Sequence, residues 1–277
     1  MKGFQNLGNT CYMNSAIQLL LNSKYFCRII MKYQQKKNNI RGLAEFIKNY
    51  HLSQGGIESP KLIKDLVSDN ELFAGTSQQD SAEFIIYFLD KIEKMIKRKN
   101  IYSDFEIDEN SIVKCKLKDC NNISKTKYKR LFLMLSISEN HKNLNDCYRE
   151  YKKNEKLEDD NMWYCEKCKK KRIASKRLEI NNWPTNLLIK LKRFTYDING
   201  QRKISKSINC PLDWRHGYKL HGGIIHYGST LDSGHYIYFG KYFNNWYIFN
   251  DTIINKIDQN QLQKLTKISY ILHYIKE

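Results

Sequence analysis

Residues 6–20 read NLGNTCYMNSAIQLL, a cysteine preceded by turn-forming residues and followed by a patterned apolar run. The apolar residues of this run recur at helical spacing, at Met13, Ala16, Ile17, Leu20 and Leu21. The spacing predicts a helix from Cys11 to Asn22. Unpaired backbone N–H groups and the positive end of the helix dipole stabilise a thiolate in the first turn. Cys11 is therefore either a nucleophile or a buried thiol at a helix start, and a histidine elsewhere must decide between them.

The chain has 277 residues, enough for one large domain or two small ones with a substantial core. Its beginning, MKGFQNLGNTC, has no apolar signal region, and no segment approaches the ~20 apolar residues that span a bilayer. We therefore expect a soluble intracellular protein, cytoplasmic or nuclear, with no membrane partner. Its eight cysteines are expected to be thiols, metal ligands or a nucleophile rather than disulfides.

The formal net charge is +18, and residues 114–177 alone carry 19 basic and 9 acidic side chains. Such a balance indicates a nucleic acid or an acidic protein surface as a partner. The competing interpretation is a coding bias, because Lys, Asn and Ile are abundant along the whole chain. That bias is typical of a low-GC genome, such as that of a parasite or of a large virus acting in a host cell.

Sequence patterns divide the chain into a helical first third and a β-rich remainder. A second helix is predicted by Ile85, Phe88, Leu89, Ile92 and Met95, with Ser77 as its cap. A less regular helical stretch, 40–67, precedes it. From Ser111 onward alternation predicts strands, as at Leu187, Ile189, Leu191, Trp246 and Ile248. The junction is expected within residues 97–110.

His235 has the most informative context of the seven histidines, because it begins an aromatic, alternating segment. Gly234 before it permits close approach of another backbone. Asn250 and Asp251 follow fifteen and sixteen residues later, and either could accept from the imidazole N–H and fix its tautomer. The Asn6 amide could donate to a developing oxyanion. His226 is the rival base.

Six segments, in chain order, resemble the successive boxes of the ubiquitin-specific protease family: NLGNTCYMNSAIQLL, SQQDSAEF, CEKC, LLIKLKRF, SGHYIYF and WYIFND. The resemblance implies an α+β fold of papain-like, right-hand architecture, with a helical thumb, a β palm and β fingers that grip ubiquitin. It implies a single catalytic domain over 1–277, acting as a monomer. Residues 1–100 would form the thumb, 101–180 the fingers with part of the palm, and 181–277 the palm that carries the catalytic histidine.

The implied activity is that of a deubiquitinating cysteine protease, which hydrolyses the isopeptide or peptide bond after the C-terminal glycine of ubiquitin. Cys11 would be the nucleophile, His235 the base and Asn6 the oxyanion donor. Asn250 occupies the position that orients the histidine, usually an aspartate in the family, and Asp251 is kept as a second candidate for that task. If His235 lies directly opposite Asn250, the hairpin needs a wide loop, Lys241–Asn245, or a bulge.

The family's substrate contacts map onto the second box. The resemblance implies that Asp80 and Glu83, on one helix face, contact arginines of the ubiquitin tail. Gln78 and Gln79 would assist through their backbone. Gly234 would leave a narrow channel for the glycines that end this tail.

Four of the cysteines are candidate ligands of a metal ion. The pair Cys165 and Cys168 has the two-residue spacing of a zinc knuckle, whereas Cys115 and Cys120 are separated by four residues, and Cys115 is the doubtful ligand. We expect a structural zinc held by all four thiolates. Four protein ligands leave no position for a reacting water, so no cofactor is expected for catalysis.

Two other classes of protein remain as alternatives. A catalytically weak or inactive ubiquitin-binding scaffold of the same fold is opposed by the intact Cys11, His235 and Asn6. A zinc-ribbon nucleic-acid binder would leave the Cys11 segment unexplained, and the sequence alone shows no aromatic platform for stacking RNA bases.

Overall fold

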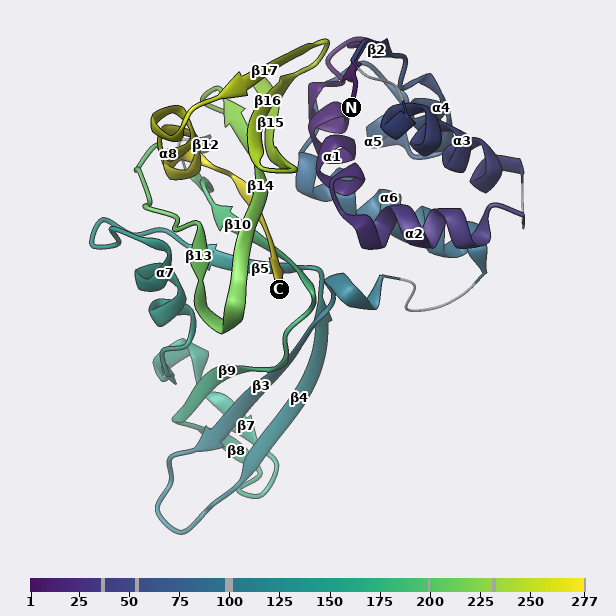
Figure 1. Ribbon diagram of the computed structural model, residues 1–277. Coiled ribbons are helices and arrows are strands. Elements are labelled where there is room, and N and C mark those ends of the chain that lie inside the picture. Colours follow the sequence, from purple (N-terminus) through teal and green to yellow (C-terminus); the bar gives the residue numbers. More distant parts are fainter. Residues whose placement is uncertain (36–37, 53–54, 98–101, 199, 231–232, 277) are drawn as a thin grey trace.

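The computed structural model describes residues 1–35, 38–52, 55–97, 102–198, 200–230 and 233–276. A helical lobe packs against one face of a large sheet, and a second sheet extends away from both (Figure 1). The order of helices first and strands afterwards confirms the predicted α+β class. Within the described residues, no helix is both long and apolar enough to cross a bilayer.

The helical lobe is built around α1 (Cys11–Leu21), in which every residue is buried. The lobe also contains α2 (Lys24–Tyr33), α3 (Asn38–Leu52), α4 (Lys61–Leu66), α5 (Glu71–Ala74), α6 (Ser81–Ile96) and the parallel pair β1 (Gly3–Phe4) and β2 (Ile57–Glu58). A helix that is buried on all sides must keep its polar side chains hydrogen-bonded. The predicted first helix is confirmed, one residue shorter at its end.

The start of α6 differs from the prediction. Asp80 is the N-cap, with its Oδ1 accepting from the Ala82 N–H at 2.6 Å. Ser77 lies three residues upstream of the cap, so the prediction that Ser77 caps this helix is wrong. The physical reason is that a cap must directly precede the first helical residue in order to reach its free N–H groups.

The main sheet, the palm, has the strand order β17-β16-β15-β14-β18-β10-β5, with β13 added on β14. Its strands are β5 (Phe132–Ser136), β10 (Asn186–Lys192), β13 (Asp213–Trp214), β14 (Tyr218–Tyr227), β15 (His235–Tyr242), β16 (Asn245–Asn250), β17 (Ile253–Ile257) and β18 (Ile271–Lys276). The side chains of adjacent residues in a strand point to opposite faces. Leu188 and Ile224 accordingly join the core against the helical lobe, and Leu187 and Ile225 join the core on the other face. Helices α7 (Leu144–Tyr151) and α8 (Gln259–Ile268) contribute to that second core.

A tyrosine fastens α1 to the palm. The Tyr238 hydroxyl accepts from Asn22 Nδ2 at 2.6 Å, immediately after the end of α1. Gly222 leaves room for this contact, because a Cβ there would lie 2.5 Å from the same hydroxyl. The helix that begins at Cys11 is thereby held against β14 and β15, the strands that carry the candidate histidines.

The finger sheet has the order β4-β3-β9-β6 and extends away from the helical lobe (Figure 1). Its strands are β3 (Ile107–Cys115), β4 (Ile123–Arg130), β6 (Glu155–Leu157) and β9 (Ala174–Asn182), and the small hairpin β7 (Trp163–Cys165) and β8 (Lys170–Arg172) lies at its far end. The remaining elements are the hairpin β11 (Phe194–Asp197) and β12 (Gly200–Lys203) and three 3-10 turns, η1 (Ser103–Phe105), η2 (Asp159–Asn161) and η3 (Arg215–Gly217). The helices of the lobe end at Ile96 and β3 begins at Ile107, within the predicted junction, of which residues 98–101 lie outside the described part.

Candidate active site

Cys11 is the first residue of α1 and is buried, with 2% of its surface exposed. The loop before it folds around the Asn6 side chain, whose Oδ1 accepts from the backbone N–H groups of Gly8 and Thr10, each at 3.1 Å. Gly8 has a φ of 100°, which a residue with a side chain rarely adopts. The sequence Asn-Leu-Gly-Asn-Thr therefore forms a tight loop that presents the thiol at the helix N-terminus.

His235 begins β15 and connects the two candidate partners. Its imidazole is hydrogen-bonded to the Cys11 thiol, and its Nε2 donates to Asn250 Oδ1 at 2.6 Å. Because Nε2 is used in this way, Nδ1 is the nitrogen left for Cys11. The contact with Cys11, supported by that with Asn250 and opposed by burial, raises the pKa of His235 to about 9. At neutral pH the ring is an imidazolium facing the thiol sulfur.

The hairpin that brings His235 and Asn250 together differs from the prediction. Strands β15 and β16 are joined by a two-residue turn, residues 243–244, so the expected wide loop over Lys241–Asn245 is wrong. That expectation required His235 to lie directly opposite Asn250. In the observed register the two residues are diagonal neighbours on one face of the hairpin, and such a diagonal is short enough for side chains to bridge.

Asp251 contacts the helical lobe rather than His235. Its carboxylate accepts from Asn6 Nδ2 at 2.9 Å and from Asn14 Nδ2 at 2.7 Å, and its backbone carbonyl accepts from the Phe4 N–H at 2.8 Å. Its charge makes only the smallest of the contributions that raise the pKa of His235. Of the two residues left open by the sequence, Asn250 holds the histidine and Asp251 holds Asn6.

The sequence reasoning missed Asn14. This residue lies one helical turn after Cys11 and is buried, and its amide also donates to the Gln5 carbonyl at 3.2 Å. The available signal was a polar residue within a helix whose neighbours are mostly apolar, since buried amides are retained only where they have partners.

The substrate-binding candidates separate into buried and exposed groups. Asp80 is buried, and its Oδ2 lies 2.5 Å from the Tyr270 hydroxyl and 3.1 Å from Lys190 Nζ. Glu83 is exposed on α6. The two carboxylates therefore do not form one exposed pair, because that of Asp80 contacts Tyr270 and Lys190 whereas that of Glu83 is exposed.

Gln78 and Gly234 lie beside the rival histidine, and Gln79 is half-buried next to Gln78. Gln78 Nε2 lies 3.2 Å from His226 Nε2. Burial, together with the nearby Lys203 ammonium, lowers the pKa of His226 to about 4. At neutral pH His226 is therefore uncharged and accepts from Gln78. Gly234 has a φ of 132°, and a Cβ there would lie 2.8 Å from the same ring nitrogen, so close packing explains this glycine.

The four candidate metal ligands meet at the far end of the finger sheet. The sulfur atoms of Cys115, Cys120, Cys165 and Cys168 all lie within 4.8 Å of one another, so Cys115, the doubtful ligand, belongs to the cluster. In the longer pair, Asp119 and Asn121 adopt left-handed backbone conformations that turn the chain back. Four sulfur atoms at these separations could hold one metal ion.

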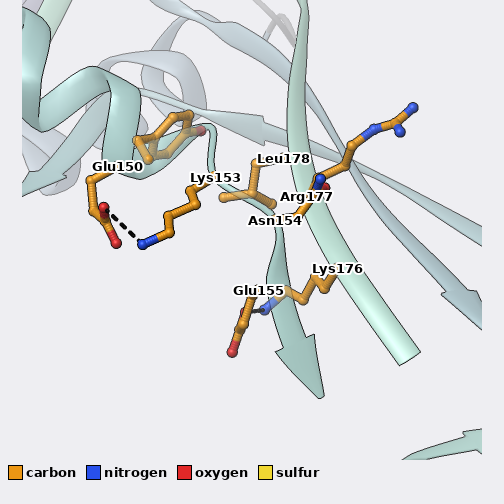
Figure 2. Close-up of a pocket in the computed structure, with 8 residues that line it drawn as sticks. Glu150, Lys153, Asn154, Glu155, Lys176, Arg177 and Leu178 are labelled. Carbon is orange, nitrogen blue, oxygen red and sulfur yellow. Dashed lines mark ion pairs between the residues drawn. The ribbon is translucent and has the colours of Figure 1, made fainter. Parts of the chain in front are cut away.

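A hollow of about 310 Å³ lies elsewhere, between α7 and strands β6 and β9 (Figure 2). Four of its charged side chains are paired with one another, Lys153 with Glu150 at 3.6 Å and Lys176 with Glu155 at 3.2 Å. None of its lining residues belongs to the elements that hold Cys11 and His235, so this hollow is not the candidate active site.

Comparisons with known proteins agree with this geometry. A sequence model of the family described as ubiquitin carboxyl-terminal hydrolase matches residues 2–274. The chain is 29% identical over 336 aligned positions to ubiquitin carboxyl-terminal hydrolase 12 of Salmo salar, covering 98% of this chain and 88% of that protein. In a solved SAGA DUB module of Ubp8, Sgf11, Sus1 and Sgf73 bound to monoubiquitin, one chain is 27% identical to this chain, with a TM-score of 0.84. The match covers all of this chain and 69% of that chain. The same module bound to ubiquitin aldehyde is 26% identical with a TM-score of 0.82, covering all of this chain and 70% of that one.

Proposed function

The chain belongs to the ubiquitin carboxyl-terminal hydrolase family, and from this premise we propose how its residues share the work of the reaction. It is a deubiquitinating cysteine protease, which hydrolyses the isopeptide or peptide bond after the C-terminal glycine of ubiquitin. The observation that carries the proposal is the contact set of His235, which joins the Cys11 thiol on one side and Asn250 on the other.

Cys11 is the nucleophile and His235 its acid and base. The Cys11 sulfur lies beside the His235 imidazole and attacks the carbonyl carbon of the scissile bond as a thiolate, the nucleophilic form of a cysteine. His235 then gives its proton to the leaving amine, and the acyl-enzyme is hydrolysed by a water that His235 deprotonates. Asn250 accepts from Nε2 and so fixes the ring with Nδ1 toward the sulfur.

Asn6 is the side-chain donor to the oxyanion, and Asp251 and Asn14 position it. One N–H of the Asn6 amide donates to Asp251, which leaves the second N–H of the same nitrogen for the substrate oxygen. Asn14 donates to the other oxygen of Asp251 and so fixes the carboxylate. Rigid donors of this kind stabilise the negative charge that develops in the transition state.

The substrate tail contacts α6 through Glu83. An exposed carboxylate without an ion-pair partner among the described residues can accept from an arginine of the ubiquitin tail. Asp80, by contrast, keeps α6 in place through its cap and its contacts with Tyr270 and Lys190. Gln78 and Gln79 enter through their backbone, and Gly234 keeps the approach to the nucleophile narrow.

The cysteine cluster holds a structural zinc. Four thiolates are the donor set that zinc prefers in structural sites, and Cys115, Cys120, Cys165 and Cys168 would hold the ion together. The ion would stabilise the end of the finger sheet, where β7 and β8 are too short to be stable alone.

The chain is proposed to form a single catalytic domain that acts as a monomer on ubiquitin or ubiquitinated proteins, since one chain carries every proposed site residue. The thumb comprises 1–100, the fingers with part of the palm 101–180, and the palm 181–277. None of the eight cysteines forms a disulfide, which supports the cytoplasm or the nucleus, where cysteines stay reduced.

Hydrolysis of a ubiquitin–fluorophore conjugate tests the proposal. Turnover by the native chain that Cys11→Ala abolishes supports the assignment. Binding of ubiquitin without turnover by the native chain would instead support the inactive scaffold, and the absence of both would contradict both.

A further inference from the structure

The positive charge of the chain is concentrated on the fingers, along strand β4 and at the far end of the finger sheet. Residues 111–130 and 163–177 together hold fourteen Lys and Arg against two acidic residues, Asp119 and Glu166. These 35 residues therefore carry +12 of the net charge of +18. A coding bias spread along the chain does not produce such a concentration, so this end of the fingers has a charge that the hydrolase activity does not explain.

The two segments form one surface, which we call the finger tip and define as residues 111–130 and 163–177. Strand β3 pairs with β9 as far as Cys115 and Ala174, and the Lys116 N–H continues the contact to the Ile173 carbonyl at 2.9 Å. The cysteine cluster joins the β3–β4 loop to the β7–β8 hairpin. Figure 1 shows both at the end of the molecule furthest from the helical lobe.

Most lysines of the finger tip have no acidic partner. Nearby carboxylates pair with five of the fourteen basic residues, Lys129, Arg130, Lys169, Lys176 and Arg177. Eight exposed lysines form no ion pair within the part of the chain that the structure describes: Lys114, Lys116, Lys118, Lys125, Lys127, Lys167, Lys170 and Lys171. Crowded, unpaired ammonium groups repel one another, and a polyanion relieves that repulsion.

The arginines of the finger tip are already engaged. Arg130 pairs with Glu109 at 2.6 Å and Arg177 with Glu179 at 2.7 Å, and Arg172 hydrogen-bonds to the Cys168 sulfur. The basic groups that remain unpaired are lysines. A lysine ammonium contacts a phosphate as a point charge and, unlike the planar guanidinium of arginine, does not form paired hydrogen bonds to the edge of a base. The surface therefore suits a phosphate backbone of any sequence.

The arrangement of the side chains favours a single strand. Lys125 and Lys127 lie on the same face of the edge strand β4, about 6.7 Å apart along it. On the β7–β8 hairpin, Tyr164 lies directly opposite Lys171, with 48% of the tyrosine exposed. An exposed ring beside an ammonium group matches one nucleotide, because the base stacks on the ring and the phosphate contacts the amine.

We propose that the finger tip binds single-stranded nucleic acid without sequence preference, with phosphates on Lys125, Lys127 and Lys171 and a base on Tyr164. The carboxylates of an acidic polypeptide would satisfy the lysines but offer no flat ring that stacks on Tyr164. The sequence alone does not show this platform, since the fold is what places Tyr164 beside Lys171.

Fluorescence anisotropy of a fluorescein-labelled 20-nucleotide oligouridylate with the full chain tests the proposal at several salt concentrations. The variant K125Q/K127Q/K171Q should bind more weakly, and the slope of log K against log salt should shrink by about 2, since each lost phosphate contact removes roughly 0.7. The matched control, K256Q/K264Q/K267Q, removes the same charge from exposed positions on β17 and α8 and should keep the native slope. Tyr164→Ala should weaken binding about tenfold, and Tyr164→Phe should retain it.

Equal losses in the finger-tip and control variants would overturn the proposal, because binding would then follow net charge alone. Binding of a polyglutamate of equal charge as tightly as the oligonucleotide would also overturn it and would assign the surface to acidic protein segments. Each variant should also unfold at the same temperature midpoint as the native chain, which excludes misfolding as the cause of weaker binding.

Discussion

Asp251→Asn tests the division of labour within the site most sharply, because it changes one atom and keeps the shape of the side chain. Asp251 has a φ of 48°, a conformation that asparagine also tolerates, so the backbone should not move. The native carboxylate accepts from two amides, that of Asn6 at 2.9 Å and that of Asn14 at 2.7 Å. An asparagine offers one oxygen and one NH₂ group, so one of the two amide donors must then face another donor.

The expected loss follows from these contacts. A hydrogen bond to a charged group contributes about 1.5–3 kcal/mol. If the lost bond is one that fixes the Asn6 amide in the transition state, kcat falls roughly tenfold to 150-fold. Removal of the oxyanion donor itself, by Asn6→Ala, sets the upper limit at roughly 100-fold to 1,000-fold.

The assay is a double-mutant cycle in the hydrolysis of a ubiquitin–fluorophore conjugate. Because Asp251 acts through Asn6, the double variant Asp251→Asn/Asn6→Ala should lose about as much kcat as Asn6→Ala alone. Asn250→Ala is the matched control, since Asn250 acts through His235. Its loss should multiply with that of Asp251→Asn.

Two results would refute this reasoning. Native kcat in Asp251→Asn would show that the carboxylate does not position the oxyanion donor. The opposite pattern would show that Asp251 acts through His235: the kcat loss of Asp251→Asn would multiply with that of Asn6→Ala, and the double variant Asp251→Asn/Asn250→Ala would lose no more kcat than Asn250→Ala alone.

Four further predictions concern the other residues of the proposed sites. Cys11→Ala removes the largest cause of the raised pKa of His235, so the NMR titration midpoint of His235 should fall from about 9 toward about 6.5; an unchanged midpoint would contradict the contact. The pKa of His235 is higher in the folded chain than in the unfolded chain, so the folded chain binds more protons between about pH 6.5 and pH 9. The contribution of His235 to the free energy of unfolding is therefore present below about pH 6.5 and is lost as the pH rises to about 9. His235→Gln should abolish this pH dependence of stability in denaturant titrations. Cys165→Ser should lower both the zinc content measured by native mass spectrometry and the midpoint of thermal unfolding, whereas Cys27→Ser, outside the cluster, should retain the metal; equal metal in both would rule out the cluster as the site. Glu83→Arg should raise KM about tenfold with kcat unchanged, while Glu71→Arg, also exposed, should have no effect; equal KM values would remove Glu83 from the substrate tail.

The periodicity of apolar residues along the chain predicted individual helices and strands. The apolar spacing after Cys11 produced α1, and the alternation around Leu187 and Trp246 produced β10 and β16, because burial of one face sets these periods. The order of helices and strands, with the resemblance of six segments, was sufficient for the fold class and the reaction.

The errors concern how side chains meet across the fold. The hairpin prediction required His235 and Asn250 to lie directly opposite each other, whereas the fold joins them along a diagonal. Asp80 was predicted to share one helix face with Glu83, because its tertiary partner, Tyr270, is 190 residues away in sequence. Asn14 was missed because its role depends on Asp251, which only the palm brings to α1. Long-range contacts of this kind have no signature in a local window.

Every proposed step depends on Cys11 as the nucleophile that attacks the ubiquitin C-terminus. Intact-mass measurement with peptide mapping, after reaction with ubiquitin that carries an electrophilic C-terminal group, tests it directly. We expect one ubiquitin per chain, attached at Cys11 and absent in Cys11→Ala. Attachment at any of the other seven cysteines, or undiminished labelling of Cys11→Ala, would contradict it.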